Sequence, residues 1–204
     1  MPKVTEEHVA ARRRQILSAA LRCFAREGFH RTTMQDIFRE AELSPGAVYS
    51  YFKGKDELIL AIVVEMMSFV GGAVAVFAEP LPEGRLRRPG EALEQMVGLF
   101  GEFELGTVVE RARIFPYLAG EQQRNPQLNS AVRAGLENLR SGFETLARAA
   151  QERGELDPRH DPVEFSRLPL SLLQGLLIQI GVYGEEINMR DYASAARELI
   201  DGPG

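Results

Sequence analysis

The spacing of apolar residues along the chain predicts helices. Between Glu7 and Arg26 the apolar positions recur at helical intervals and form one face, at Ile16, Leu17, Ala20, Leu21, Phe24 and Ala25. Gly28 can adopt the left-handed conformation that ends a helix, and Phe29 can supply the hydrophobic contact that follows. The sequence lacks the period-two alternation and the Asn-Gly or Asp-Gly turns that indicate strands. We therefore expect an all-α fold that opens with an amphipathic helix.

Local signals predict three further helix starts soon after the first helix. Thr33 stands three residues before Asp36, so a cap is followed by an acid at the third helical position. Ser44 is a good N-cap, and Pro45 suits the first helical position because the N–H that proline lacks would be unpaired there. Acids at positions 56–57 then favour the start of a longer helix. The N-terminal region should contain short helices in close succession.

The remainder of the chain also has a helical pattern. Residues 78–91 concentrate Pro and Gly, which predicts a loop between a helix that ends near Phe77 and one that starts near Glu91. Asp161 and Pro162 resemble a cap and a first helical residue, and the helix they begin should reach Ile180. Before them, apolar residues step by three and four at Leu136, Leu139, Phe143, Leu146 and Ala150.

Charge is distributed unevenly between two segments. Residues 1–55 hold 10 Lys and Arg against 6 Asp and Glu, a balance of +4. Residues 56–204 hold 14 against 23, a balance of −9, and the two sum to the net charge of −5. A basic segment attached to an acidic one suggests a polyanion-binding head on a body with another role. We therefore expect an N-terminal domain over residues 1–55 and a second domain over residues 56–204.

Several classes of protein are disfavoured by composition. Cys23 is the sole cysteine, so one chain can form neither a disulfide nor a thiolate metal cluster. The charged N-terminus lacks the apolar segment of a secretory signal, and the apolar stretch 168–182 is interrupted by Pro169, Gln174 and Gln179. These features favour a cytoplasmic protein that spans no membrane, with no metal and no cofactor.

Two short helices joined by a tight turn have the spacing of a DNA-reading helix-turn-helix. On the second helix Val48 and Phe52 are four residues apart and should face inward. Small residues on the outer side would let the backbone approach the major groove, where Ala47 can touch a thymine methyl and Ser50 can bond a base edge. Backbone N–H groups at the helix starts and an ammonium group would hold phosphates. The candidate DNA-binding residues are Thr33, Ser44, Pro45, Gly46, Ala47, Tyr49, Ser50 and Lys55.

Structural alternatives exist for these residues. Thr33 can serve only as a cap, and residues 53–55 can be a solvated turn. Tyr49 and Tyr51 can both be core aromatics, because any compact unit of three helices produces a similar pattern.

The stretch "GFHRTTMQDIFREAELSPGAVYSYFKGKDELI", preceded by "RRRQILSAALRCFAREG", resembles the TetR family of bacterial transcriptional regulators. The resemblance covers roughly residues 10–60. It implies an all-helical homodimer in which an N-terminal helix-turn-helix domain binds palindromic double-stranded operator DNA. It also implies a C-terminal domain that dimerises and binds a small effector. In that reading Thr33 caps a helix and contacts phosphate, residues 44–52 form the recognition helix, and Tyr49 and Lys55 contact the DNA backbone.

Two residues depart from the family pattern. Phe38 stands where the family usually has Ala, so the head must accommodate a larger side chain. Glu42 replaces the usual turn glycine and places a carboxylate near the DNA face, where it would repel phosphates.

The body has no comparable signature. The resemblance suggests that helices over roughly residues 129–153 and 161–183 form a four-helix dimer interface, and their leucines supply apolar surface for one. A monomeric core is the alternative. An apolar or amphipathic effector should bind between the head and this interface. The candidate residues are Phe69, Phe77, Met96, Phe100, Phe103, Phe115, Tyr117 and Gln174, although aromatics at helical spacing also form plain cores.

We therefore expect a ligand-responsive repressor that releases its operator when an effector binds. A dimeric ligand sensor or scaffold that does not act through DNA is the alternative. An enzyme is disfavoured because the sequence contains three His and lacks the common metalloprotease, serine-hydrolase and P-loop motifs, so no catalytic residues are predicted.

Overall fold

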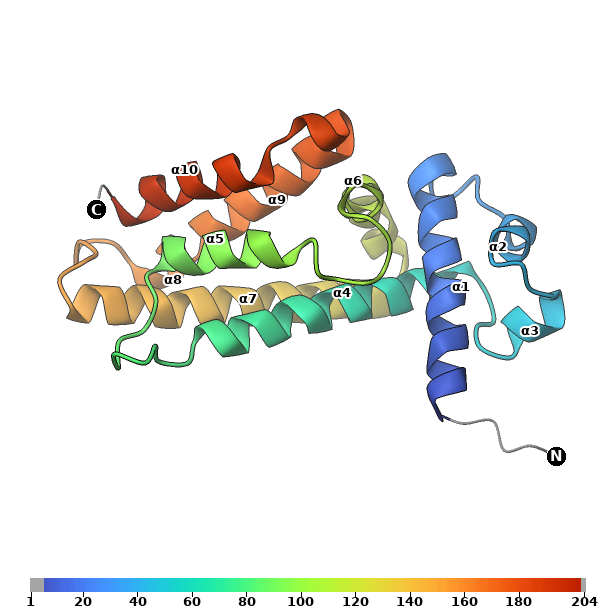
Figure 1. Ribbon diagram of the computed structural model, residues 1–204, viewed down its shortest axis with the longest axis horizontal. Helices are drawn as coiled ribbons and strands as arrows, with labels where there is room; N and C mark the ends of the chain where they lie inside the picture. Colours follow the sequence, from blue (N-terminus) through green and yellow to red (C-terminus); the bar gives the residue numbers. More distant parts are fainter. Residues whose placement is uncertain (1–5, 203–204) are drawn as a thin grey trace.

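The computed structural model describes residues 6–202 and arranges them as a small helical head at one end of a long helical body (Figure 1). The head contains α1 (Glu6–Glu27), α2 (Met34–Glu40) and α3 (Pro45–Tyr49). The body contains α4 (Lys55–Phe77), α5 (Pro89–Leu99), α6 (Val108–Arg124), α7 (Pro126–Glu152), α8 (Pro162–Phe165), α9 (Arg167–Tyr183), a 3₁₀ turn η1 (Gly184–Glu186) and α10 (Met189–Asp201). No strand occurs within the described residues, so the all-α prediction is confirmed.

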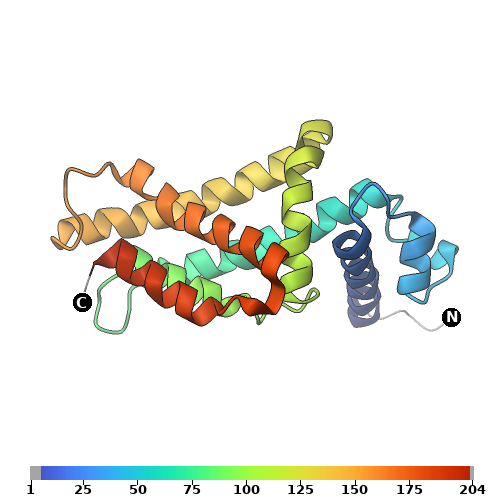
Figure 2. The same ribbon diagram turned by 90° about the horizontal axis from the view of Figure 1, so that it is seen from above.

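The head lies across the end of the body. In Figure 1, α1 stands across the long axis of the body, and α2 and α3 lie on its outer side. Figure 2 shows α6 crossing the body beside α1, while the start of α4 passes α6 and reaches the head. The last described residues lie at the opposite end of the molecule from α2 and α3. Helix α6 is therefore placed to contact both the head and the interior of the body.

Most predicted caps are confirmed. Gly28 follows α1 with a φ of 80°, and the Thr33 hydroxyl and the Asp36 carboxylate form the two halves of a capping box. The Ser44 hydroxyl accepts a hydrogen bond from the Ala47 N–H at 3.3 Å. The Asp161 carboxylate caps α8 in the same way. These boundaries follow from interactions within a few residues, so the local sequence specifies them.

Three helix boundaries differ from the sequence prediction. Helix α3 ends at Tyr49 rather than at residue 52, because the N–H groups of Tyr51 and Phe52 both turn back to the carbonyl of Val48. The helix expected over 161–183 is two helices, α8 and α9, joined at the buried Ser166. A further helix, α10, follows them.

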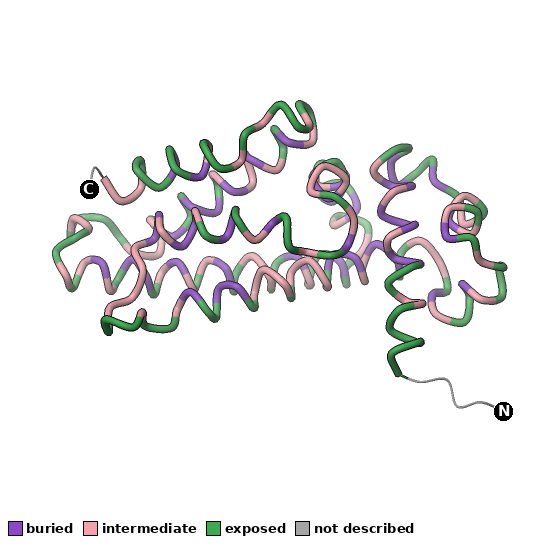
Figure 3. Tube along the Cα trace, in the orientation of Figure 1, coloured by how far each residue is buried: buried purple, intermediate pink, exposed green. Residues whose placement is uncertain are grey.

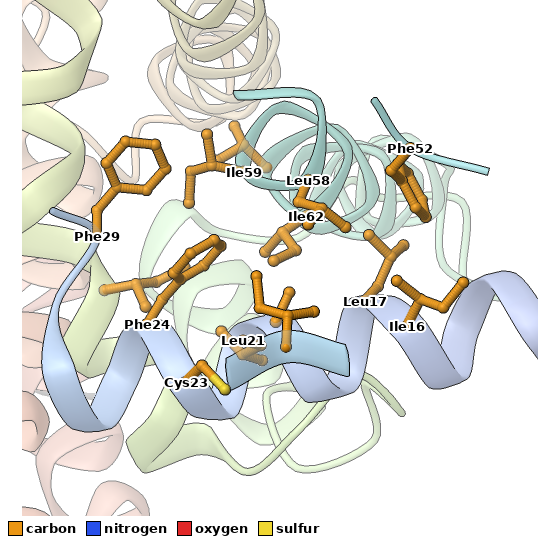
Figure 4. Packing of buried hydrophobic residues seen from close by; sticks show 14 of the residues in the cluster. Ile16, Leu17, Leu21, Cys23, Phe24, Phe29, Phe52, Leu58, Ile59 and Ile62 are labelled. Atoms are coloured by element: carbon orange, nitrogen blue, oxygen red, sulfur yellow. The ribbon is translucent and has the colours of Figure 1, made fainter. Parts of the chain in front are cut away.

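The buried side chains form two clusters. The first fills the head and also includes the start of α4 and parts of α6 and α7; Figure 4 shows Phe24 and Leu21 of α1 facing Leu58 and Ile62 of α4. The second fills the body between α4, α5, α7, α9 and α10. Figure 3 shows the buried residues lying along the inner faces of these helices. Because α4 contributes to both clusters, it joins the head to the body.

The apolar row on α7 has a different role from the one predicted. Leu139, Phe143, Leu146 and Ala150 are buried in the body cluster of the protomer itself. Helix α7 packs closely along α4, since a Cβ at Gly142 or Gly135 would come closer than 3.0 Å to Val74 or Met67. This row therefore belongs to the internal core, and the prediction that it supplies the dimer interface is wrong.

Two segments are long and apolar enough to cross a membrane by length and composition alone. They are Lys55–Phe77 and Pro162–Glu186. Both contribute side chains to the clusters described above, including Ile62 and Leu176, which are fully buried. The core helices of a soluble protein satisfy the same test, so these segments are weak evidence for a membrane span.

Candidate nucleic-acid interface and ligand cavity

The outer end of the head consists of α2, a tight turn and α3. Glu40 near the end of α2 accepts a hydrogen bond from Arg22 of α1 at 2.6 Å and a longer one from Arg26 at 3.3 Å. The amide of Gln15 donates to the carbonyl of Ala41 at 2.8 Å. These contacts hold α2 against α1. The turn that follows therefore has a defined position, and α3 projects from a supported base.

Helix α3 presents a small exposed face. Val48 and Phe52 are buried, as predicted, and anchor the segment in the head cluster. Ala47 is partly exposed, and the Ser50 hydroxyl donates to its carbonyl at 2.7 Å, which leaves the hydroxyl oxygen able to accept a further bond. The remaining predicted contact residues on this segment are exposed: Ser44, Pro45, Gly46, Tyr49 and Ser50.

Phe38 and Tyr49 explain how the head accommodates the larger side chain at position 38. Their rings meet edge to face, with centroids 5.3 Å apart. Phe38 is partly buried against the head cluster, while Tyr49 keeps half of its surface exposed. The aromatic pair supports the body of the tyrosine and leaves its hydroxyl at the surface.

Thr33 and Asp36 form a closed pair at the start of α2. The Thr33 hydroxyl donates to Asp36 Oδ2 at 2.6 Å and accepts from the Asp36 N–H at 3.2 Å. The side-chain bond from Thr33, followed by the bond from its backbone N–H, lowers the pKa of Asp36. Thr33 is exposed and fulfils its predicted capping role, so its contact with phosphate remains a prediction.

Lys55 has partners inside the protein. Its ammonium donates to the carbonyl of Phe29 at 2.8 Å and to that of His30 at 3.4 Å, and it lies 4.9 Å from the centroid of the Phe29 ring. Lys55 therefore ties the start of α4 to the turn after α1. The predicted phosphate contact would use donor capacity left over from these bonds.

Glu42 adopts a left-handed backbone conformation with a φ of 55°, and it is the only non-glycine residue with a positive φ among residues 6–202. This conformation suits the glycine that the family pattern has at this turn. The exposed carboxylate of Glu42 stands between α2 and α3, next to the surface that would face DNA.

A cavity of about 790 Å³, including solvent at its mouth, lies within the body. It is enclosed by α4, α6, α7, α9 and the segment between α5 and α6, and it borders both buried clusters. Its lining is apolar apart from Arg111 and Gln174. A cavity with this lining suits a ligand that is mainly apolar.

The structure brings five of the eight predicted effector residues to this cavity: Phe69, Phe100, Phe103, Phe115 and Gln174. Phe77 and Met96 lie instead in the body cluster, beside a smaller hollow near Gly142. Tyr117 is 48% exposed, and its ring lies against Gly28 of the head. Their assignment to the effector site is therefore corrected, because helical spacing placed them on apolar faces without specifying which neighbour covers each face.

Arg111 is a wall residue to which the sequence prediction gave no definite role. Its side chain is buried and donates to the carbonyls of Phe100, Phe103, Leu105 and Gly106. Burial lowers the pKa of Arg111. Arg111 therefore holds the segment between α5 and α6 in place beside the cavity. Its sequence context, an arginine inside an amphipathic helix, did not distinguish it from a surface charge.

Two parts of the cavity wall also contact the head: the segment between α5 and α6, and helix α6 itself. Leu105 is part of the head cluster, and a Cβ on Gly106 would collide with the side chain of Leu21. Glu121 of α6 forms an ion pair with His30 at 3.0 Å if the imidazole is protonated. The surface next to the cavity wall is thus in direct contact with α1 and with the turn that follows it.

Comparisons with known proteins match this architecture. A family model described as "Bacterial regulatory proteins, tetR family" matches residues 16–62. The HTH-type transcriptional regulator UidR of Escherichia coli strain K12 is 32% identical over 191 residues, which cover 93% of this chain and 91% of UidR. The chain belongs to the TetR family.

Solved TetR-family structures share the fold over nearly the whole chain. GusR of Salmonella enterica superposes with a TM-score of 0.70 at 26% identity and covers 98% of this chain and 97% of its own. A complex of SmeT with triclosan superposes with a TM-score of 0.70 at 23% identity and covers 93% of this chain and 90% of its own. TetR-family regulators bind operator DNA as dimers and bind small effectors. The protein is thus a DNA-binding transcriptional regulator that responds to a ligand.

Proposed function

We propose that the exposed face of α3 binds a palindromic operator and that an effector in the body cavity causes release. One observation carries the proposal: α6 and the segment before it form a wall of the cavity and also contact the head. A ligand that alters the position of this wall therefore acts directly on the surface that supports α1. Only a difference in ligand affinity between the DNA-bound and released arrangements can shift that equilibrium.

Within the head, we assign base contacts to the small residues at the tip of α3 and backbone contacts to its borders. Gly46 and Ala47 would lie close to the groove floor, and Ser50 would bond a base edge. Thr33, Tyr49 and the start of α4 at Lys55 would hold phosphates. This assignment is supported by the exposure of Gly46, Tyr49 and Ser50 and by the buried anchors Val48 and Phe52.

For the dimer contact we propose the outer face of α9 together with α10. Large apolar side chains are exposed there, with Val182 of α9 at 71% and Leu199 of α10 at 76%. Gly175 lies at the middle of α9, and a Cβ at this residue would meet nothing within 4 Å. A second copy of the same face would cover this surface and place two heads on the two halves of a palindrome.

Several features complete the proposal. Residues 1–55 act as the DNA-binding domain and residues 56–204 as the effector and dimerisation domain, with α4 packed into both. The protein acts in the cytoplasm and works by binding rather than by catalysis. Among residues 6–202 no three His, Cys, Asp or Glu side chains are placed to hold a metal ion.

DNA binding is tested directly with the purified full chain. Selection from random duplexes should recover a palindrome, and the recovered DNA should bind with an affinity that falls as salt is raised. Ser50→Glu should weaken that binding at least a hundredfold, because a carboxylate would face the DNA. Ser130→Glu, a matched change at an exposed residue of α7, should leave it unchanged.

The alternative of a sensor that does not act through DNA makes the opposite prediction. Under it, selection would recover no common sequence at low salt, and Ser50→Glu would behave like Ser130→Glu. That pair of results would overturn the proposed function.

A further inference from the structure

The body cavity continues into a polar cleft that contains three arginines. The two hollows share Leu136 of α7 and Leu170 and Gln174 of α9 in their linings. Beyond these shared residues, the cleft is lined by the arginines Arg133, Arg140 and Arg167 and by one acid, Glu137, together with Gln122, Asn129, Val132 and Ser171. An apolar chamber therefore borders a polar one.

The cleft is built from two facing helices with regular spacing. On α7, polar residues recur at Asn129, Arg133, Glu137 and Arg140. On α9, polar residues recur over 167–174 in the same way. Positions three and four apart share one helical face, so each helix presents a polar strip to the cleft. The lining holds three arginines and one glutamate, but Glu144 and Glu164 just outside it also pair with Arg140 and Arg167.

Two polar groups at this junction make no hydrogen bond or close ion pair with another described residue. Arg140 is engaged by Glu137 at 2.6 Å and by Glu144 at 2.7 Å, and Arg167 is engaged by Glu164 at 3.1 Å. Arg133, in contrast, makes no hydrogen bond or close ion pair with any residue in the range 6–202 and is attracted to Glu137 only at longer range. The Gln174 amide makes no hydrogen bond within the same range. The guanidinium of Arg133 and the amide of Gln174 therefore keep their hydrogen-bonding groups available beside the apolar cavity.

Arg111, the charged group inside the cavity, is not available in the same way. Its guanidinium donates to four backbone carbonyls, two of them those of Phe103 at 3.0 Å and Leu105 at 2.9 Å. A ligand anion that took these donors would leave buried carbonyls unpaired, which is costly. An anionic group is therefore better held at the mouth by Arg133 than inside by Arg111.

We propose that the effector is an amphipathic anion whose apolar part fills the cavity and whose carboxylate or phosphate binds Arg133 at the mouth, with Gln174 bonding atoms near the junction. The inference rests on the proposed effector role of the cavity and adds the charge of the ligand. A carboxylate or phosphate pairs with a guanidinium through two parallel hydrogen bonds, whereas a cationic head would be repelled by Arg133. A purely apolar ligand would use the cavity and leave the cleft unused.

The test measures binding of defined amphiphiles to the full chain, without DNA, by calorimetry below their micelle concentrations. The probes are dodecanoate, dodecyl phosphate and dodecanoyl-CoA as anions, dodecanol as the neutral molecule and dodecyltrimethylammonium as the cation. The anions should bind about tenfold more tightly than dodecanol, the cation should bind more weakly still, and added salt should reduce only the preference for anions. Comparison of the three anions distinguishes a carboxylate from a phosphate head.

Arg133→Gln removes the free charge at an exposed site and should weaken binding of the preferred anion about tenfold, equivalent to about 1.4 kcal/mol. Dodecanol binding should not change. Arg113→Gln is the matched control, because Arg113 is exposed on α6 and lines neither the cavity nor the cleft. Thermal unfolding of both variants checks that each remains folded.

The inference is overturned if dodecanol binds as tightly as the anions, if no probe binds, or if Arg133→Gln and Arg113→Gln behave alike. These outcomes are separable from failure of the proposed function. Loss of operator binding with the anion preference intact would remove the regulatory role alone. Operator binding without any preference for anions would remove the inference alone.

Discussion

At the scale of single residues, Glu42 combines backbone strain with an unfavourable charge. Its left-handed conformation costs a non-glycine residue about 1 kcal/mol, part of which is offset because glycine is more flexible in the unfolded chain. Glu42→Gly should therefore raise the free energy of unfolding by about 0.5 to 1 kcal/mol. It should also tighten operator binding several-fold at low salt by removing a charge that repels phosphate. Denaturant unfolding and operator titrations measure the two effects.

Glu42→Ala separates strain from charge. Alanine keeps the backbone strain and lacks the carboxylate, so operator binding should improve while the free energy of unfolding stays close to that of the natural chain. Equal stabilisation by Gly and Ala would show that the left-handed conformation does not limit stability.

Glu40 predicts how the head responds to acid. The hydrogen bond from Arg22 lowers the pKa of Glu40 below its ordinary value of 4.5, with a smaller contribution from Arg26. A lowered folded-state pKa stabilises the fold above the ordinary value, and this stability is lost as pH falls through the lowered pKa. Glu40→Gln should therefore reduce the free energy of unfolding by about 0.5 to 1 kcal/mol at pH 7, and the difference from the natural chain should vanish in acid.

Urea unfolding at a series of pH values, from neutral to about pH 3, measures this difference for Glu40. Glu102→Gln is the control, since Glu102 is exposed and makes no ion pair with another residue in the range 6–202. If the difference in the free energy of unfolding between Glu40→Gln and the natural chain stayed constant over the whole pH range, the stabilising role of ionised Glu40 would be contradicted.

At the scale of helices, the exposed face of α9 should control self-association. Val182→Arg would place a charge in the apolar contact of both copies and should weaken dimerisation roughly a hundredfold. Val76→Arg is the matched control, because Val76 is 55% exposed on α4, which Figure 1 places on the opposite side of the body from α10. Sedimentation velocity measures the fraction of dimer in both variants. A dimer that survives Val182→Arg would move the interface to another surface.

Local signals predicted the helix starts well. The caps at Thr33, Ser44 and Asp161 depend on hydrogen bonds to residues two or three positions away, which the sequence displays directly. The break at Ser166 did have a signal, Pro169, which was read only as an interruption of an apolar stretch. Proline has no N–H to bond the carbonyl of Phe165 four residues earlier, so it suits the first turn of a new helix, where α9 places it.

It was harder to predict which helices pack against each other. The row from Leu139 to Ala150 shows that one face of α7 is apolar, but periodicity cannot specify whether α4 or a second chain covers it. The same ambiguity placed Tyr117 in the effector site when its ring actually lies against Gly28. Arg111 was underestimated for the opposite reason, because its four partners are backbone carbonyls, which no side-chain pattern reveals.

At the scale of the whole molecule, the contact between α6 and the head should transmit the ligand signal. His30 meets Glu121, and Gly28 meets Tyr117. The double variant His30→Ala, Tyr117→Ala should leave operator affinity and ligand affinity nearly unchanged when each is measured alone. The factor by which the ligand lowers operator affinity should be roughly fivefold smaller in the double variant than in the natural chain, which lies within the usual range of coupling energies.

Operator titrations with and without saturating ligand measure the coupling. His160→Ala is the control, because His160 is exposed in the segment between α7 and α8, which Figure 1 places at the end of the body away from the head. If the coupling in the double variant equalled that of the natural chain, the α6 contact would not transmit the signal, and α4 would be the next element to test.

The interaction between α5 and α10 bears on how the chain reaches this fold. The Asp201 carboxylate accepts hydrogen bonds from the N–H groups of Gly90 at 2.7 Å and Glu91 at 3.1 Å, across more than a hundred residues of sequence. The Arg88 N–H at the start of α5 is capped locally by the Glu91 carboxylate, but the N–H groups of Gly90 and Glu91 lack this partner until α10 has been synthesised. Because closing such a long loop delays the contacts that depend on it, maturation of the effector cavity during synthesis should trail behind that of the local helices of the head.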